Sequence, residues 1–510
     1  MNTDISGTSR RRLALLLSCA LALATGACTA PTGPSLAEAA PTLDARVQVP
    51  ADTVRSAFEQ RWDAVSAAWD GVSPITADAT MRCALANNRT LRRTMLELER
   101  RRAAAQDAQL PPNPTVELAL GAPLGMGVTP ILGMLAQQVD WLWRRDAIAS
   151  DADAQLRTML LEAAAVTVAT AVEVRANYVD AAAAFEQREL ALQGAQVATR
   201  VLAAQESAFG AGEATAAGVN QARMASADAD NRVMEAETQL LASQTKLLES
   251  IGRGAHGLSW RTADATAAEA RRACGIVAPP QPEDDATLHA LVREMRMDLR
   301  AADARVQGAE ARVRLAESGR LPSLFLGAGY ERDMEGDAAV MFSAQSQVPL
   351  WNDQRYRIAV AQWELEMARL DADRVWQRAV IDARRALAAV GAADHHLATL
   401  RDRTLPSLEA NRRLVADSVE VGQRRPIDLW RSEQQRLRVL AQVARAERDR
   451  ALAALAFENA LAGGRLPSGS SSMGSPAGMG TAGLGSMGAM GVGADTGGPD
   501  LEFTTLETMQ

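Results

Sequence analysis

Few residues of this chain combine the types and the spacing that catalysis or metal binding requires. His395-His396 follows Asp394 and offers imidazole and carboxylate ligands, but adjacent residues do not share one face of a helix. The run Gly252–Gly257 has the glycine content of a phosphate-binding loop, without the strand that precedes such loops. The sequence also has no nucleophile elbow and no pair of zinc ligands. We therefore expect a protein that is not an enzyme, with no catalytic residue, no metal site and no cofactor.

Methionine recurs in the last segment of the chain, residues 464–510, together with Gly, Ser and Ala. Thioether sulfurs can bind Cu(I), whereas tracts of such low complexity usually form flexible linkers or tails. We interpret this segment as a disordered tail, and copper binding is the alternative. Its methionines include Met473, Met479, Met487 and Met490.

The composition favours long helices and argues against nucleic acid as a partner. Hydrophobic residues, mostly small ones, make up 47% of the chain, whereas aromatic residues make up 4%. Alanine-rich sequence with dispersed charge suits helices that pack at close range. The formal net charge of −8 indicates no basic surface for nucleic-acid phosphates.

The first residues have the organisation of an export signal. Arg10-Arg11-Arg12 precede an apolar stretch that is too short to span a bilayer. Small residues then lead to Cys28, as in bacterial lipoproteins, and Thr29 in place of Asp is usual for lipoproteins of the outer membrane. We predict a signal peptide over residues 1–27 and an N-terminal arm, lipidated at Cys28, over residues 28–80. A plain secretory signal is the alternative.

The chain repeats itself once, with landmarks about 210 residues apart. Gln137–Arg144 returns as Ser346–Asp353, an offset of 209 residues (348 − 139), and Gly212 returns as Gly422, an offset of 210 (422 − 212). Each copy reads as a helix, a pair of strands, a very long helix, a tight turn and a long helix. A repeat of this length is a duplicated domain and not a solenoid unit. We assign the copies to residues 81–252 and 286–463, with a linker over residues 253–285.

The strand pairs have the pattern of transmembrane barrel strands. We predict strands over Thr115–Ala122 and Ser323–Glu331, and a return strand over residues 340–348. In the return strand apolar residues alternate with polar ones, as in strands that face lipid on one side and a lumen on the other. Since no segment after the signal peptide is long and apolar enough for a membrane helix, a membrane crossing would have to use strands.

Trp141, Trp143 and Trp351 all stand where a strand passes into a helix. Tryptophan collects at the membrane–water boundary of transmembrane barrels. We therefore predict an interfacial aromatic girdle, and ordinary core tryptophans are the alternative.

The long helices must be packed along their whole length. Asp146–Ser207 and Asp353–Val419 are almost free of Gly, although Gly391 and Pro406 interrupt the second. About 65 helical residues span roughly 100 Å, and such helices are stable only when they pair. The return helices carry two adjacent apolar rows at intervals of seven, which indicates neighbours on two sides, as in a closed helical barrel. These rows include Ser226, Val233, Leu240 and Leu247 beside Ala227, Met234, Leu241 and Leu248, and then Trp430, Leu437, Ala444 and Ala451.

Four strands per chain cannot close a barrel, since the smallest known barrels have about eight. If the strands cross a membrane, the chain must oligomerise, and a trimer would supply twelve strands.

Cys83 and Cys274 lie near the start of the two copies. In an oxidising compartment they could form a disulfide. Two unpaired buried thiols are the alternative.

Taken in order, these motifs resemble the TolC-like family of outer-membrane efflux proteins over about residues 80–463. No single motif is decisive, but their order at a duplicated spacing is specific. The motifs that carry the resemblance are Ala84–Arg89, Leu110–Pro114, Leu321–Leu324, Val348–Trp351 and Val421–Asp428.

The resemblance implies a mainly α-helical α+β fold assembled as a homotrimer. Four strands per protomer would form a twelve-stranded β-barrel in contact with outer-membrane lipid, and this barrel would continue into a long periplasmic α-helical barrel. Members of the family receive substrates from an inner-membrane transporter and a periplasmic adaptor protein, and they do no covalent chemistry. The sequence leaves the exported substrate open among drugs, metal ions and polypeptides.

The resemblance also assigns roles to the periplasmic tip. Asp428, six residues after Gly422, matches an acid that rings the narrowest point of the pore in this family. Its counterpart in the first copy, six residues after Gly212, is Gly218. The residues expected to contact the adaptor are Gly210, Gly212, Val421 and Gly422.

Three arginines surround this acid in the sequence. Arg424 and Arg425 lie four and three residues before Asp428, within helical pairing distance, and Arg431 stands where some members carry a second acid. We expect these residues to modulate a gate at the pore constriction. The alternative is a solvated surface ion pair of little energetic weight.

Two other classes of protein share some of these features. A periplasmic adaptor also has long helical hairpins, but it carries one hairpin and no duplicated unit with strands between helices. A structural coiled-coil lipoprotein would not need alternating strands. The sequence therefore favours the channel over both.

Overall fold

The computed structural model describes residues 69–121, 130–254, 257–278, 282, 284–333, 336–346, 353–421 and 423–463. Cys28, Trp351, Gly422, most of the N-terminal arm and the methionine-containing tail lie outside the described residues. Within the described part of the chain, no helix has the length and apolarity that a membrane span requires.

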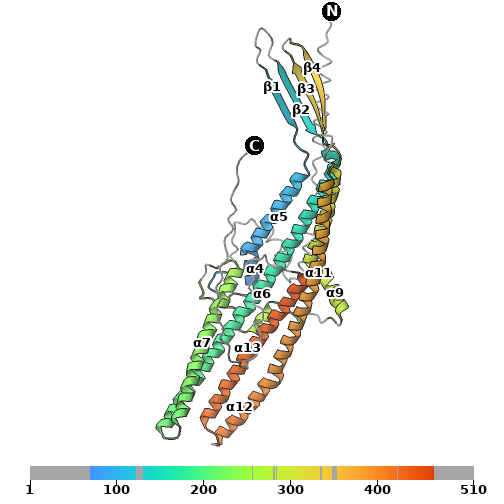
Figure 1. Cartoon of the computed structure of the whole chain (residues 1–510). Coiled ribbons are helices and arrows are strands. Elements are labelled where there is room, and N and C mark those ends of the chain that lie inside the picture. Colours follow the sequence, from blue (N-terminus) through green and yellow to red (C-terminus); the bar gives the residue numbers. More distant parts are fainter. Residues whose placement is uncertain are drawn as a thin grey trace, which may run out of the picture. The chain divides into compact units, whose positions relative to one another are not determined.

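The predicted order of elements occurs twice, and it confirms a mainly α-helical chain with a small antiparallel sheet (Figure 1). The first copy has α4 (Ala77–Asn87), α5 (Arg89–Ala108), β1 (Thr115–Leu120), β2 (Ile131–Gln138), α6 (Trp141–Gly210) and α7 (Ala216–Ser250). The short α8 (Ala267–Ala273) follows. The second copy has α9 (Asp285–Met295), α10 (Met297–Ser318), β3 (Leu324–Arg332), β4 (Ala338–Ser346), α11 (Arg355–Thr399), α12 (Leu405–Glu420) and α13 (Pro426–Ala462).

The longest helix, α6, connects the sheet to the first turn. It has 70 residues and therefore spans about 105 Å. Between Ala163 and Ala184 nearly every residue is buried or half-buried, whichever side of the helix it occupies, and most are Ala or Val. Because these side chains are small, α5, α7, α10 and α13 can all pack closely on α6.

The second long helical run is continuous from α11 into α12, with one widened turn over Leu400–Thr404. Gly391 does not break α11. Pro406 has no N–H, and its ring would clash with the carbonyl four residues earlier in an ordinary α-helix. The turn relieves this clash, because the Leu405 N–H donates to the carbonyl of Leu400, five residues back.

Four helices pack side by side at each level of the structure. Near the sheet the order is α5, α6, α10, α11, and near the turns it is α7, α6, α13, α12. Arginine–carboxylate pairs cross these contacts: Arg312 Nη1 lies 3.2 Å from Glu364 Oε2, and Arg448 Nε lies 2.8 Å from Asp180 Oδ1. At both levels the outermost helices have one side without a neighbour among the helices that the structure describes.

The heptad rows predicted for α7 differ in burial. The face of α7 that packs on α6 has the small buried residues Ala222, Ala229 and Ala236. The predicted row that contains Val233 lies next to them and is mostly half-buried. Most of the adjacent row is exposed in the protomer, with 66% of the Met234 side chain accessible. One of the two predicted neighbours is therefore present within the chain, and the other side is open.

The sheet has the order β1-β2-β3-β4, and every neighbouring pair is antiparallel. The register places one apolar residue opposite another across all four strands, as at Val116 and Leu135 or Tyr330 and Val340. This apolar face is solvent-exposed in the protomer: Val116 is 75% and Phe342 is 79% accessible. The predicted strands and their alternation are confirmed, with boundaries shifted by one or two residues.

Two equivalent junctions hold the copies in place. The Asn88 amide donates to the carbonyl of Ser250 (3.0 Å), and the Arg296 guanidinium donates to that of Ala460 (2.9 Å). Gly252 and Gly463, with φ of +73° and +69°, end the helices at these junctions. A Cβ at Gly252 would lie 2.3 Å from the carbonyl oxygen of Asn87, so a side chain cannot be accommodated there.

We expect Arg296→Leu to lower the free energy of unfolding by about 3 kcal/mol, because it leaves Asp298 without its buried partner. The measurement is urea unfolding of the detergent-solubilised protein, followed by circular dichroism. Arg320→Leu, at an exposed position, is the control and should change stability by less than about 0.5 kcal/mol. Equal effects of the two substitutions would contradict this role of Arg296.

Candidate functional site: the sheet and the helix-turn ends

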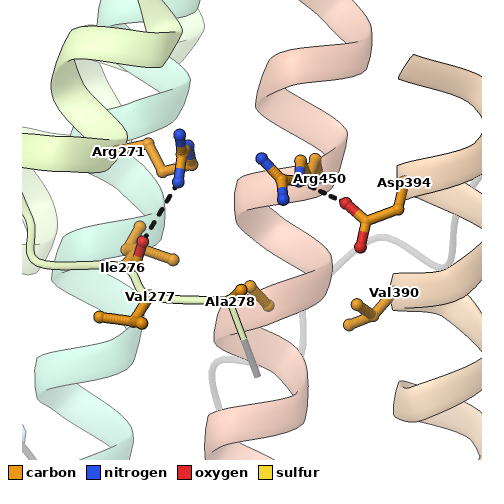
Figure 2. Close-up of a pocket in the computed structure, with 8 residues that line it drawn as sticks. Arg271, Ile276, Val277, Ala278, Val390, Asp394 and Arg450 are labelled. Atoms are coloured by element: carbon orange, nitrogen blue, oxygen red, sulfur yellow. Dashed lines mark hydrogen bonds and ion pairs between the residues drawn. The ribbon is translucent and has the colours of Figure 1, made fainter. Parts of the chain in front are cut away.

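One hollow in the described chain is lined by α11, by α13 and by the segment that follows α8 (Figure 2). Its volume of about 10 Å³ holds about one water molecule. Asp394 and Arg450 form an ion pair at its edge, and Arg271 donates to the carbonyl of Ile276 (3.4 Å). The hollow is too small for an organic substrate.

Both His395 and His396 are exposed on α11. Among the residues that the structure describes, no group of three His, Cys, Asp or Glu side chains has the arrangement of a metal site.

The two turns that follow the long helices lie next to each other. Gly210 ends α6, Gly212 has a φ of +77°, and Thr215 caps α7 by accepting from the Gly218 N–H at 3.2 Å. In the second turn Arg425 is the capping residue of α13. Its guanidinium donates to the carbonyl of Glu213 in the first turn, at 3.4 Å, so the two turns are in direct contact.

Asp428 occupies the first turn of α13, and its N–H donates to the carbonyl of Arg425 (3.0 Å). The helix begins at Pro426, so Arg424 and Arg425 precede it and helical pairing with Asp428 does not apply. No ion pair within the described residues joins Asp428 to either arginine. A carboxylate here is stabilised by the positive end of the helix, and the gating role stays a prediction.

Apolar side chains are exposed at the turns. Val421, the residue after α12, is 71% accessible, and Phe209 is also exposed one residue before the end of α6. Arg424 and Arg431, in and after the second turn, are exposed as well. A contact between these residues and an adaptor stays a prediction.

The tryptophans at the strand–helix boundary lie at the start of α6. Trp141 is half-buried, with the Arg145 guanidinium 5.3 Å from its ring centre, and Trp143 is exposed. Both follow β2 directly, where an interfacial girdle would lie. Their contact with lipid stays a prediction.

Sequence reasoning did not identify the buried polar groups of α6. Arg175 donates to the carbonyl of Cys274 (3.1 Å) and to Glu458 (2.7 Å), and the Tyr178 hydroxyl donates to Asp264 (2.6 Å). Burial, together with the Asp264 hydrogen bond, raises the pKa of Tyr178. The available signal was an Arg and a Tyr within an alanine-rich stretch, and their distant partners left no local pattern.

Cys83 and Cys274 are both free thiols and belong to one apolar cluster, in which Cys83 is fully buried. Burial raises the pKa of Cys83, and it raises the pKa of Cys274 to about 12. Their pairing in an oxidising compartment stays a prediction.

We expect both thiols to resist maleimide at pH 8 in the native protein, because fewer than about one in a thousand Cys274 thiols is ionised there. Peptide mass spectrometry before and after unfolding in urea makes the measurement, and unfolding should allow both to react. Rapid labelling of the native protein would contradict the burial. Labelling only after reduction would show a disulfide.

Comparison with known proteins gives a consistent result. No curated protein matches the sequence. Residues 288–463 match the family model described as outer membrane efflux protein. Among solved structures, CusC, which forms a transmembrane channel, matches with a TM-score of 0.62 and 16% identity, over 76% of this chain and 92% of that one.

Two further outer-membrane proteins have the same fold. VceC from Vibrio cholerae matches with a TM-score of 0.59 and 16% identity over 76% of this chain and 96% of its own. The CmeC channel of Campylobacter jejuni matches with a TM-score of 0.59 and 15% identity over 79% and 91%. Residues 288–463, the second copy, therefore match the outer membrane efflux protein family, and the fold along three quarters of the chain is that of the matched outer-membrane proteins.

Proposed function

We propose that three copies of this chain form a channel that carries substrates from an inner-membrane transporter and a periplasmic adaptor across the outer membrane. The match of residues 288–463 to the outer membrane efflux protein family supports a location in the outer membrane. The trimer, the two partner proteins and the absence of covalent chemistry are parts of the proposal. The observation that carries it is the set of open edges that the protomer presents.

Every level of the protomer ends in two different open edges. The sheet ends in β1 and β4, the helices near the sheet end in α5 and α11, and those near the turns end in α7 and α12. Contact between unlike edges of successive copies produces a ring when the rotation closes. Three copies would supply twelve strands, enough to close a barrel and leave no strand edge unpaired.

The open side of α11 carries an apolar stripe along the upper part of the helix. Tyr356 is 77% and Trp363 is 70% accessible, and spacings of three and four residues place the members on one face. A monomer rarely exposes such a stripe, so it is suited to contact with α5 of the next copy. Its members are Tyr356, Val360, Trp363, Met367 and Leu370.

The exposed apolar face of the sheet supports insertion into lipid. Barrel strands turn such a face to the hydrocarbon and the alternate side chains to the lumen. A lipid chain on Cys28 would add an anchor in the same membrane. The exposed turns, at the far end of the helices, would contact the adaptor.

We expect the outer-membrane protein, extracted in mild detergent, to have three times the mass of the mature chain by native mass spectrometry and to dissociate on heating. Trp363→Glu should reduce the trimer at least tenfold, because it places a charge within the apolar contact between helices. Gln362→Glu adds the same charge at an exposed neighbouring position and should leave the trimer intact.

A soluble monomer without a membrane fraction would contradict the channel. It would favour the adaptor or a structural coiled-coil lipoprotein. Equal loss of the trimer in both variants would contradict the assignment of the α11 stripe to the interface.

A further inference from the structure

We infer that Glu117 and Glu331 make the sheet segment of this channel selective for cations. The inference rests on the proposed function, since it requires the four strands to form part of a closed pore. It adds two specificity-determining residues that lie far from the acid at the helix turns.

The strand register places both glutamates on the face opposite the apolar one. Glu117 pairs with Met134, which pairs with Gly329, whereas the neighbouring Leu118 belongs to the apolar face. Glu331 pairs with Leu132 in β2. Directly paired residues share a face and alternate residues change face, so Glu117 and Glu331 point to the same side of the sheet.

A contact between two non-adjacent strands indicates that this side is concave. Ser343 Oγ in β4 donates to Met134 Sδ in β2 at 3.7 Å, over the intervening strand β3. The contact is possible because β3 has Gly327 and Gly329 on this face, where a Cβ at Gly327 would meet Ser343 Oγ at 2.4 Å. Side chains converge on the inner side of a curved sheet, so this side faces the lumen when the ring closes.

The negative charge on the concave face has no compensation within the described strands. Both glutamates are exposed, and no ion pair of the described residues includes either one. The one cationic side chain in these strands, Arg332, pairs with Ile131 and Ala338 and so belongs to the apolar face. The face otherwise carries neutral side chains.

The two glutamates occupy successive layers of the sheet. Glu117 aligns with Gly329, which is two residues before Glu331, so the layers are about 7 Å apart along a strand. Three copies would place six carboxylates in the lumen, within roughly one Debye length of each other along the pore. A pore lined with carboxylates in this way concentrates cations and excludes anions.

The helix turns carry charges of both signs. Asp428 is accompanied there by Arg424, Arg425 and Arg431, and by the acids Glu213 and Glu420. The concave face of the sheet differs because its two acids have no cation on the same face, and this charge favours cationic over anionic substrates at the point of exit.

The experiment is the reversal potential of purified trimers in planar bilayers of neutral lipid, under a tenfold KCl gradient. The wild-type channel should prefer potassium to chloride. Glu117→Gln with Glu331→Gln should lower the permeability ratio by roughly threefold or more, and each single substitution should have a smaller effect in the same direction. Arg332→Gln, on the apolar face, is the control and should leave the ratio unchanged.

The outcomes separate this inference from the proposed function. Wild-type protein that never conducts would contradict the channel itself. A conducting wild-type channel without cation preference, or a preference that persists in the double variant, would overturn the role of the two glutamates alone. Should the double variant fail to assemble, an unchanged ratio in both single variants would also overturn it.

Discussion

A helix of 70 residues owes its stability to side-chain packing, because helix propensity alone supports only marginal structure in water. In α6 that packing comes from α5, α7, α10 and α13, and the alanine-rich stretch from Ala163 to Ala184 allows each of them a close approach. The buried Arg175 and Tyr178 add hydrogen bonds that fix α6 against α13 and the segment around α8. The sheet and the turns are therefore positioned by one element, since α6 begins directly after β2 and ends at the first turn.

The same arrangement leaves strand edges without hydrogen-bond partners and apolar helix faces exposed among the described residues. Backbone groups on the outer sides of β1 and β4 have no ladder partner among the described residues, and a membrane offers them no water. In the helical part, apolar side chains such as Trp363 and Met234 remain exposed to solvent. The proposed closure among copies would meet both requirements at once, because one assembly would pair the strand edges and cover the exposed helix faces.

The sequence predicted the elements well where the signal was local. Alternation in β4 and the order of elements at a duplicated spacing were visible, and the structure confirms them. Of the two heptad rows predicted in α7, one is half-buried against α6 and most of the other is exposed in the protomer. The sequence predicted less where distant segments decide the outcome. Arg296 and Arg175 look like ordinary surface charges until Ala460 and Glu458, partners more than 160 residues away, are known. The predicted pairing of Arg424 and Arg425 with Asp428 was wrong because it assumed that all three residues lie in one helix, whereas α13 begins at Pro426. The proposal that Glu117 and Glu331 face the lumen needed the register of four strands, which one strand alone does not define.

The central claim is that unlike strand edges of successive copies join, and cysteine cross-linking tests it most directly. A cysteine at Leu118 of β1 is combined in turn with one at Val340, Phe342 or Ala344 of β4, all on the apolar face. In outer membranes under mild oxidation, at least one pair should give linked dimers and trimers and nothing larger, and the single-cysteine variants should give none. Linked dimers from Leu118→Cys alone, or no linkage with any pair, would contradict the account.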